Sequence, residues 1–504
     1  MLYSYLQKHL YNLNSKAISI PEGFTSILPF FLSFGYFFTA YSSWPVFYCL
    51  VHPKKMAFIH PIQAVIASKD DDIIYTIIKN TIAVFQRDSS NLTYRLIGTW
   101  VDTYDRTESV REKVTKEQER QILQNMKEHD DNSGEPALKK RREAKVPTAG
   151  PGAPPVYAYL RNLMLSGDSS RLFACADSDK SVLVFDIDLK NTENCLHLVK
   201  RQPFPKRLNA ITTGEDDTVI FVADKFGDVY SMGVTGDIVL EKDMKPILGH
   251  VSMLTSILFA KDSKNSEFLI TADRDEHIKI SHYPQTYVID KWLFGHREYI
   301  ASVICPKWDP SLLLSAGGDD SVFLWNWESS KLLGKFKYSD LIQPYLTDDH
   351  LAPIRFQNEA NDVIEFGVAN VTALPDLPFV AFFVEATKLL FILKVDLEKS
   401  EGDMLSLVQQ IEFPYNIVSA SANNNSEFVV SLDNRSSGDK DFVKFIKLEK
   451  GTSNFVIDED LSKSFDDVLI SNLKEDPRVC VGDSRDVFPL YITSTLRKHG
   501  EHYS

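Results

Sequence analysis

Cysteine is scarce in this chain of 504 residues, and its five cysteines form no CxxC pair. Their scattered positions argue against a zinc module and against a disulfide framework, and they favour a reducing compartment. Positive charge is also in deficit, because 69 acidic residues stand against 55 basic ones and give a net charge of −14. A protein whose whole surface binds nucleic acid is usually basic, so any RNA contact must be local or shared with a partner.

Local catalytic motifs are missing as well. The chain contains no GxGxxG, GxxxxGK[ST], HExxH or GxSxG string, the patterns that mark dinucleotide, nucleotide, metalloprotease and serine-hydrolase sites. The glycine-rich stretch AGPGAPP at 149–155 has too many prolines and no helix after it to form a phosphate-binding turn. We therefore predict that this chain carries no catalytic residues of its own.

Charge is absent from one long segment near the N-terminus, residues 23–51. Its length suffices for a membrane span, which needs about 20 apolar residues, although it contains Pro29 and Pro45. Residues 1–55 are open to three interpretations: a membrane anchor, a leader that is later removed, or a chain that really begins at Met56. We favour a start at Met56, because MAFIHPIQAV reads as the opening strand of a soluble domain, and we expect no membrane partner.

The rest of the chain is organised by a repeated turn. Four segments align on an alanine that precedes a polar turn, at intervals of 47, 49 and 44 residues, namely at Ala176, Ala223, Ala272 and Ala316. An apolar strand comes before each turn and an alternating strand after it, which is typical of a β-propeller. Three weaker hairpins at 73–86, 377–396 and 426–450 bring the number of blades to seven. We predict an all-β, seven-bladed propeller with its first blade at 56–102 and the other blades and a C-terminal tail at 156–504.

A second repeated marker is the Gly-His pair that ends at His250 and at His296. His296, Ser315, Asp319 and Trp325 match the hydrogen-bond relay of WD repeats, in which a buried aspartate accepts from the histidine and a hydroxyl links the histidine to the tryptophan. This match makes the fold a WD-repeat propeller. The Gly-His marker assigns His250, and the alanine alignment assigns Asp275 and Asp179, to the corresponding structural positions of their blades. Metal ligands must converge in space, whereas these residues occur one set per blade, so we predict no metal site.

Residues 103–155 interrupt the repeat between the first two blades. REKVTKEQERQILQNMKEH could form a short helix, and we expect the proline- and glycine-rich remainder to be disordered or extended. The run KKRR fits a minimal nuclear import signal, and on its residues alone it fits a solvated charge run equally well. Its members are Lys139, Lys140, Arg141 and Arg142.

Several strings together resemble one family. They are GAPPVYAYLRNL, CADSDKSVLVFD, ADKFGDVYS, LGHVSMLT, TADRDEHIKISHYPQ, DKWLFGH and LRKHGEHYS. With MAFIHPIQAV as the opening, the chain from Met56 to Ser504 resembles the fungal WD-repeat non-catalytic subunit of the tRNA (guanine-N7-)-methyltransferase. Residues 1–55 have no counterpart in that family's pattern.

The resemblance implies a heterodimer with a catalytic subunit that binds S-adenosylmethionine, while this chain holds no cofactor. The non-catalytic subunit would stabilise its partner, hold it in the active conformation and reach tRNA through the complex, which forms N7-methylguanosine in the variable loop. It implies a nuclear location, with the cytoplasm also open. It further implies that Lys279 pairs with an acidic residue of the partner.

The segment TADRDEHIKISHYP carries more charge than its sibling turns. Arg274 has no role in the relay and is expected to reach outward, and the remaining partner-binding candidates are Glu276, His277 and, on the neighbouring blade, Lys225. A different class of function stays open beside this one: a general WD-repeat adaptor, for example a ubiquitin-ligase substrate receptor, which would have several partners and no link to tRNA.

Overall fold

The computed structural model describes residues 57–68, 72–88, 90, 92–130, 157–437 and 440–499, all of them within the unit Met56–Ser504. The predictions for residues 1–55 and for the run Lys139–Arg142 fall outside the described residues. Within the described ranges, no helix is both long enough and apolar enough to cross a membrane.

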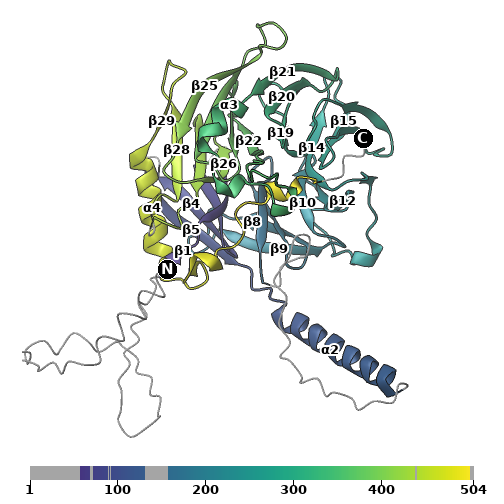
Figure 1. The fold of residues 1–504 in the computed structure, drawn as a ribbon. Coiled ribbons are helices and arrows are strands. Elements are labelled where there is room, and N and C mark those ends of the chain that lie inside the picture. The colour runs from purple at the N-terminus through teal and green to yellow at the C-terminus, as the bar shows by residue number, and fades with distance from the viewer. Residues whose placement is uncertain are drawn as a thin grey trace, which may run out of the picture. The chain divides into compact units, whose positions relative to one another are not determined.

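The predicted seven-bladed propeller is confirmed (Figure 1). Each blade is a four-stranded antiparallel sheet whose strands follow one another in chain order. The first four blades are β2 (Ile62–Ala67), β3 (Ile73–Ile78), β4 (Thr81–Asp88) and β5 (Thr93–Val101); β6 (Leu160–Leu165), β7 (Arg171–Ala176), β8 (Ser181–Ile187) and β9 (Leu196–Pro203); β10 (Leu208–Thr213), β11 (Val219–Asp224), β12 (Asp228–Gly233) and β13 (Leu248–Gly249); and β14 (Leu254–Lys261), β15 (Glu267–Asp273), β16 (Ile278–Tyr283) and β17 (Ile289–Leu293).

The other three blades complete the ring. They are β18 (Ile300–Ile304), β19 (Leu312–Gly317), β20 (Ser321–Asn326) and β21 (Lys331–Lys337); β22 (Val368–Ala373), β23 (Phe379–Val384), β24 (Leu389–Val395) and β25 (Leu405–Glu412); and β26 (Ile417–Ala422), β27 (Glu427–Leu432), β28 (Val443–Leu448) and β29 (Phe455–Ile457). The charged insertion follows β5, and its helix α2 spans Thr107–Asp130, longer than the segment predicted.

The hydrophobic core is divided into seven clusters, one between each pair of neighbouring blades. Because each sheet is covered on both faces, its second strand is buried along most or all of its length; FVAFFV in β23 is wholly apolar, and IIYTII in β3 is apolar except for Thr76. The first strand of each blade faces the central channel and is only partly buried. Burial therefore falls on the strands that the sequence marks as most apolar.

Polar side chains join the first strands around the channel. The Asn162 amide donates to the Asn209 carbonyl at 2.8 Å, and the Asn209 amide donates to the Leu254 carbonyl at 2.7 Å. At the seam between the last and first blades, the backbone N–H of Val65 donates to the Ser419 hydroxyl at 3.2 Å. Such bonds fix the blades to one another without a continuous sheet.

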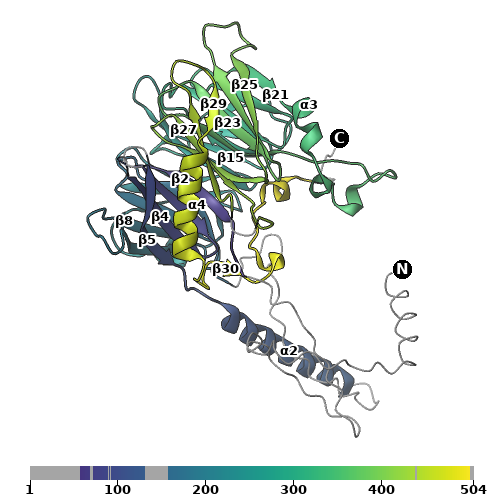
Figure 2. The ribbon, with the colours of Figure 1, turned by 90° about the vertical axis from the view of Figure 1, so that its left-hand side faces the viewer.

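The ring is closed by the C-terminal helix α4 (Glu459–Leu473), which packs against β5 of the first blade and β28 of the last (Figure 2). Its apolar side recurs every four residues and includes Leu461, Phe465 and Leu469, all buried in the core cluster at the seam. Two short strands, β1 (Phe58–Ile59) and β30 (Cys480–Val481), pair on the same side of the ring. A short helix α3 (Ser339–Ile342) lies in the connection after β21.

Residues 488–499, which we call the tail, cross one end of the ring. They contact the β15–β16, β19–β20, β23–β24 and β27–β28 turns through hydrogen bonds. We call this end of the propeller the tail face. The turns between second and third strands, and the connections between blades, all lie on it, because they leave the same ends of the strands.

Candidate partner-binding site

The relay predicted in the fifth blade is present as three hydrogen bonds. His296 Nδ1 lies 2.7 Å from Asp319 Oδ2, and His296 Nε2 lies 2.7 Å from Ser315 Oγ. The Trp325 indole donates to the same hydroxyl at 2.8 Å. The histidine, serine and tryptophan are buried, so the relay satisfies polar groups that water does not reach and thereby fixes the blade's strands.

In the fourth blade the histidine–aspartate and histidine–hydroxyl bonds of this relay are present, but the aspartate is not the one that the alanine alignment assigned. His250 Nδ1 lies 2.8 Å from Asp273 Oδ2, and its Nε2 lies 2.8 Å from Thr271 Oγ1. The assignment of Asp275 to this position is therefore wrong. The turn after β15 places its aspartate directly after Ala272, whereas the turn after β19 places it further on. The backbone N–H of Asp275 donates to Asp273 Oδ1 at 2.8 Å instead.

Electrostatics in this relay follow from burial. Removal from water lowers the pKa of His250, and the hydrogen bond with Asp273 acts against that shift. Burial works to raise the pKa of Asp273, but His250 and the turn amide of His277 outweigh it, so this pKa lies below its usual value. The pair therefore holds a neutral imidazole beside an ionised carboxylate near neutral pH, a structural arrangement rather than a proton-transfer site.

Lys279 lies inside the blade. It pairs with Thr271 across the β15–β16 ladder, the position that Phe323 takes beside Ser315 in the fifth blade. The side chain is only 4% exposed, its Nζ donates to the Gly249 carbonyl at 2.5 Å, and it lies 5.6 Å from the centroid of the Trp292 ring. Burial lowers the pKa of Lys279, while Asp273 opposes the shift. The Lys279 side chain therefore does not point outward, where it could pair with an acidic residue of a partner.

Arg274 also differs from the expectation that it reaches outward. Its Nε donates to the Leu496 carbonyl at 2.6 Å, and its Nη2 donates to the Arg497 carbonyl at 3.2 Å. The Arg274 guanidinium is therefore hydrogen-bonded to the tail.

Asp275 on the same turn faces the tail as well. It accepts from the Ser252 hydroxyl at 2.5 Å and forms an ion pair with Lys498. The β15–β16 turn is therefore held from two sides by residues of the C-terminal segment.

The outer surface of this blade carries an exposed aromatic cluster. Phe294 is 68% exposed and stacks against Trp292, with ring centroids 6.2 Å apart. His277 meets both rings edge-on. Glu276 is exposed at the tip of the turn, with φ of 66°, and Val251 is fully exposed in the preceding connection. Glu276 and His277 thus lie beside an apolar surface, as an interface position would.

The remaining assigned residues lie on neighbouring blades. Asp179 has no histidine partner, so its assignment to the relay is wrong: it accepts from Arg201 Nε at 2.7 Å and from the Ser181 hydroxyl at 2.8 Å. Lys225 lies in the β11–β12 turn, with its Nζ 5.3 Å from the centroid of the Phe226 ring. Of the predicted partner-binding residues, Lys225 is the furthest in sequence from the aromatic cluster.

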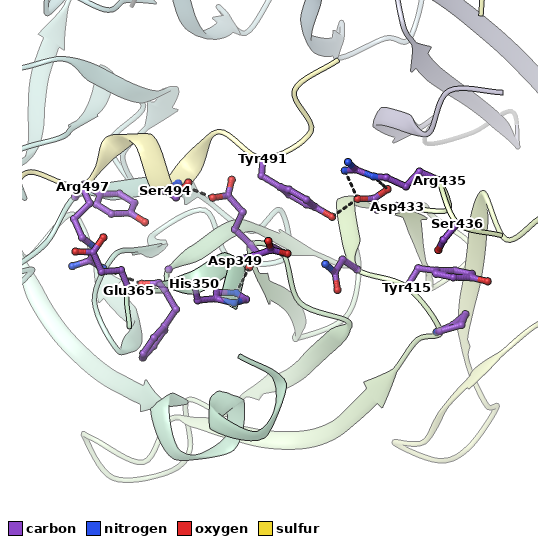
Figure 3. A pocket seen from close by; sticks show the side chains of 17 residues that line it. Asp349, His350, Glu365, Tyr415, Asp433, Arg435, Ser436, Tyr491, Ser494 and Arg497 are labelled. Atoms are coloured by element: carbon purple, nitrogen blue, oxygen red, sulfur yellow. Dashed lines mark hydrogen bonds and ion pairs between the residues drawn. The ribbon is translucent and has the colours of Figure 1, made fainter. Parts of the chain in front are cut away.

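A cavity of about 660 Å³ opens beside the tail, between the turns of the last three blades (Figure 3). The carboxylate of Glu385 accepts from the backbone N–H groups of Ile492, Thr493 and Ser494 at 2.5–2.6 Å. Asp433 accepts from the Tyr491 hydroxyl at 2.8 Å and from its ion-pair partner Arg435. These two carboxylates are therefore committed to holding the tail and its neighbouring turn. The described residues hold no cluster of His, Cys, Asp and Glu suited to a metal ion.

Comparison with known proteins decides the family. The family model of the tRNA methyltransferase TRM82 WD40 domain matches residues 74–242 and 237–450. The chain belongs to the TRM82 family. A relative from Kluyveromyces lactis is 50% identical over 450 residues, covering 88% of this chain and all of the relative. A relative from Saccharomyces cerevisiae strain S288c is 50% identical over 454 residues, covering 89% of this chain and all of the relative.

Both relatives are named tRNA (guanine-N(7)-)-methyltransferase non-catalytic subunit TRM82. The non-catalytic role predicted for this chain agrees with that name, and the general adaptor is not favoured. Among solved structures, the WD40 repeats of RRP9 align with a TM-score of 0.50 at 14% identity, covering 77% of this chain and 95% of that one. At this identity the alignment shows a shared fold alone.

Proposed function

We propose that this TRM82-family chain binds a catalytic tRNA (guanine-N7-)-methyltransferase subunit as a heterodimer and reaches tRNA through that complex. The proposal is supported by the names of its relatives and by a relay whose polar groups serve the fold. In this role the propeller stabilises the catalytic subunit and holds it in the active conformation. S-adenosylmethionine would bind to the partner.

The single observation that favours a docking surface is the exposed aromatic cluster on the fourth blade. We define the docking patch as Glu276, His277, Phe294 and Val251, with Lys225 at its edge. Large apolar groups surrounded by charge on a rigid turn are typical of interface centres, because their burial excludes water without ordering a loop. Within this patch the Phe294 ring stacks against Trp292 and meets His277 edge-on.

Lys279 and Arg274 contribute to this surface indirectly. Lys279 lies against Trp292, and Arg274 joins the turn to the tail. We assign both a supporting role beneath the docking patch. A partner carboxylate could approach Lys279 only after the surrounding rings had moved. Because Lys279 is buried, we do not expect it to contact the partner directly at the rim of the interface.

The location of the complex is a separate proposal. The run Lys139–Arg142 supports import into the nucleus, where the family resemblance places such subunits. Replacing all four residues with alanine should leave the assembled complex intact and shift a fluorescently tagged chain to the cytoplasm in live-cell imaging. An unchanged nuclear signal would remove the import role from this run.

Assembly with the catalytic subunit tests the docking patch. Phe294→Ala should weaken the complex roughly 30-fold, because truncating a central aromatic anchor typically costs about 2 kcal/mol. Tyr287→Ala is the matched control, since Tyr287 is 83% exposed in the β16–β17 turn at the other end of the same blade. Calorimetric titration of the two purified subunits measures both. Equal affinities for the two variants would place the partner elsewhere on the propeller.

A further inference from the structure

A group of cations gathers on the tail face where the second and third blades meet. Lys206 and Arg207 lie in the connection between β9 and β10, and Lys225 lies in the β11–β12 turn. The two segments are joined by a hydrogen bond from the Lys225 N–H to the Arg207 carbonyl at 3.0 Å. Three cationic side chains therefore leave one joined pair of loops in a protein whose net charge is −14.

Arg207 lies close to a carboxylate that is paired with another arginine. The buried Nε–H of Arg207 has no hydrogen-bond acceptor among the described residues. The nearby carboxylate of Asp177 is already used by Arg161, whose Nη2 donates to Asp177 Oδ2 at 2.5 Å. Buried guanidinium N–H groups are almost always paired in folded proteins. With Asp177 committed to Arg161, the charge of Arg207 is left for a ligand that reaches this loop.

The charges of this group also repel one another. Burial lowers the pKa of Arg207, and the neighbouring Arg161 lowers it further. Burial likewise lowers the pKa of Lys225, followed by the charges of Arg207 and Lys206. A bound anion would relieve this repulsion and raise both pKa values.

An exposed aromatic ring completes the group. Phe226 is 56% exposed, and the ammonium groups of Lys206 and Lys225 lie 4.5 and 5.3 Å from the centroid of its ring. Lys180, at the same end of the second blade, donates to the Pro205 carbonyl and to Glu241. A solvent-accessible ring among lysines and an unpaired arginine combines a stacking surface with phosphate-binding groups, as RNA-binding sites do.

We propose that Lys206, Arg207 and Lys225, with Phe226, form a direct RNA contact on this subunit, in which the cations bind backbone phosphates and the ring stacks on an unpaired base. The identification of that RNA as tRNA rests on the proposed function. A carboxylate of the catalytic subunit could satisfy the cations, but it would make no use of the ring between them. We therefore assign this surface, the cationic cluster, to RNA and the docking patch to the protein partner, with Lys225 at the boundary between the two surfaces.

The test titrates a labelled tRNA transcript with the chain, alone and assembled with the catalytic subunit, over a range of salt concentrations. Arg207→Met and Lys206→Met remove the charge but keep an apolar stem, and Lys450→Met removes an exposed lysine from the distant β28–β29 turn. Each cluster variant should weaken RNA binding roughly tenfold and reduce the slope of log K against log salt by about 0.7–0.9. Arg207→Lys should keep the slope, and Phe226→Ala should lower affinity at an unchanged slope.

Three controls make the result decisive. Arg207→Met should unfold at the same urea concentration as the parent or a higher one, because it removes an unpaired buried donor; a loss of stability would assign the residue to the fold. Unchanged RNA affinity together with weaker subunit assembly would assign the cluster to an acidic partner and overturn the proposal. RNA binding that changes equally in Lys450→Met would show only general charge attraction and would overturn it too. If the subunits fail to assemble at all, the proposed function fails, while the titration of the chain alone still tests the cluster.

Discussion

His250 Nδ1 lies 2.8 Å from Asp273 Oδ2 across a separation of 23 residues. His296 and Asp319 are separated by the same 23 residues and lie 2.7 Å apart. The histidine-to-aspartate spacing is thus a property of the blade, since it counts the residues of the first strand, the first hairpin and the second strand.

Replacing either of the two aspartates of the β15–β16 turn should lower the free energy of unfolding, but by different amounts. Asp273→Ala leaves His250 and two turn amides without an acceptor, so we expect the free energy of unfolding to fall by about 3 kcal/mol. Asp275→Ala loses a partly exposed pair with Lys498 and the hydrogen bond from Ser252, and it should cost about 1 kcal/mol. Urea unfolding of both variants measures the difference. Equal losses would contradict the relay assignment.

Because Lys279 is buried, we expect the free energy of unfolding to depend on both the charge and the shape of the side chain that replaces it. Lys279→Glu would place a carboxylate beside the Gly249 carbonyl and Asp273, and we expect it to lower the free energy of unfolding by about 3 kcal/mol or more. Lys279→Met keeps the packing against Trp292 and should cost about 1 kcal/mol. Urea unfolding before any binding assay separates folding from docking. A Lys279→Glu variant of parental stability would show that this side chain reaches solvent.

The start of the tail should respond to acid through His60. Its Nδ1 lies 2.7 Å from the Pro61 carbonyl, and its Nε2 accepts from the Phe488 N–H at 2.8 Å, which requires a neutral ring. Burial is the main cause that lowers the pKa of His60 from 6.5 to about 4, and the charges of Lys79 and Arg435 add to it.

Because the folded pKa lies below the unfolded one, this stabilisation is present above pH 6.5 and is lost as the pH falls towards 4. The loss amounts to about 3 kcal/mol at its full extent. We expect His60→Gln, which cannot titrate, to show a flatter dependence of unfolding free energy on pH between about pH 7 and about pH 4.5. Parallel pH profiles for the parent and the variant would contradict this account.

Glu385 should control the order of the tail. Glu385→Ala leaves the N–H groups of Ile492, Thr493 and Ser494 without their carboxylate, so we expect amide exchange there to rise at least tenfold. Glu385→Gln keeps one acceptor oxygen and should have a smaller effect. Hydrogen exchange read by mass spectrometry measures both, and the exposed Glu412 offers a control as Glu412→Ala. Unchanged protection in Glu385→Ala would mean that the tail is held by other contacts.

The fold could be predicted because its local parts repeat. Each hairpin places an apolar second strand before a polar turn, and seven such hairpins determine a ring without any long-range information. Ring closure could not be predicted in the same way. Helix α4 occurs once, and its contacts with β5 join residues from the two ends of the propeller.

The site could be predicted only where its partners are close in the chain. His296, Ser315, Asp319 and Trp325 fall within one blade, so spacing identifies them. The alanine alignment missed Thr271 and Asp273 because it assumed that the relay aspartate follows the alanine at the same distance in every blade. The spacing between histidine and aspartate would have identified Asp273. Arg274 is bound to a carbonyl 222 residues further on. A contact over this distance in the chain leaves no local sequence pattern. From the sequence alone, Arg274 therefore looks like an exposed arginine, although the tail binds it.

Reconstitution of methyl transfer tests the central claim most directly. The catalytic subunit, this chain, and the two together are each incubated with a tRNA transcript and labelled S-adenosylmethionine, and N7-methylguanosine is quantified. The account predicts full activity for the mixture, little for the catalytic subunit alone and none for this chain alone. Methylation by the isolated chain, or undiminished activity of the catalytic subunit without it, would contradict the account.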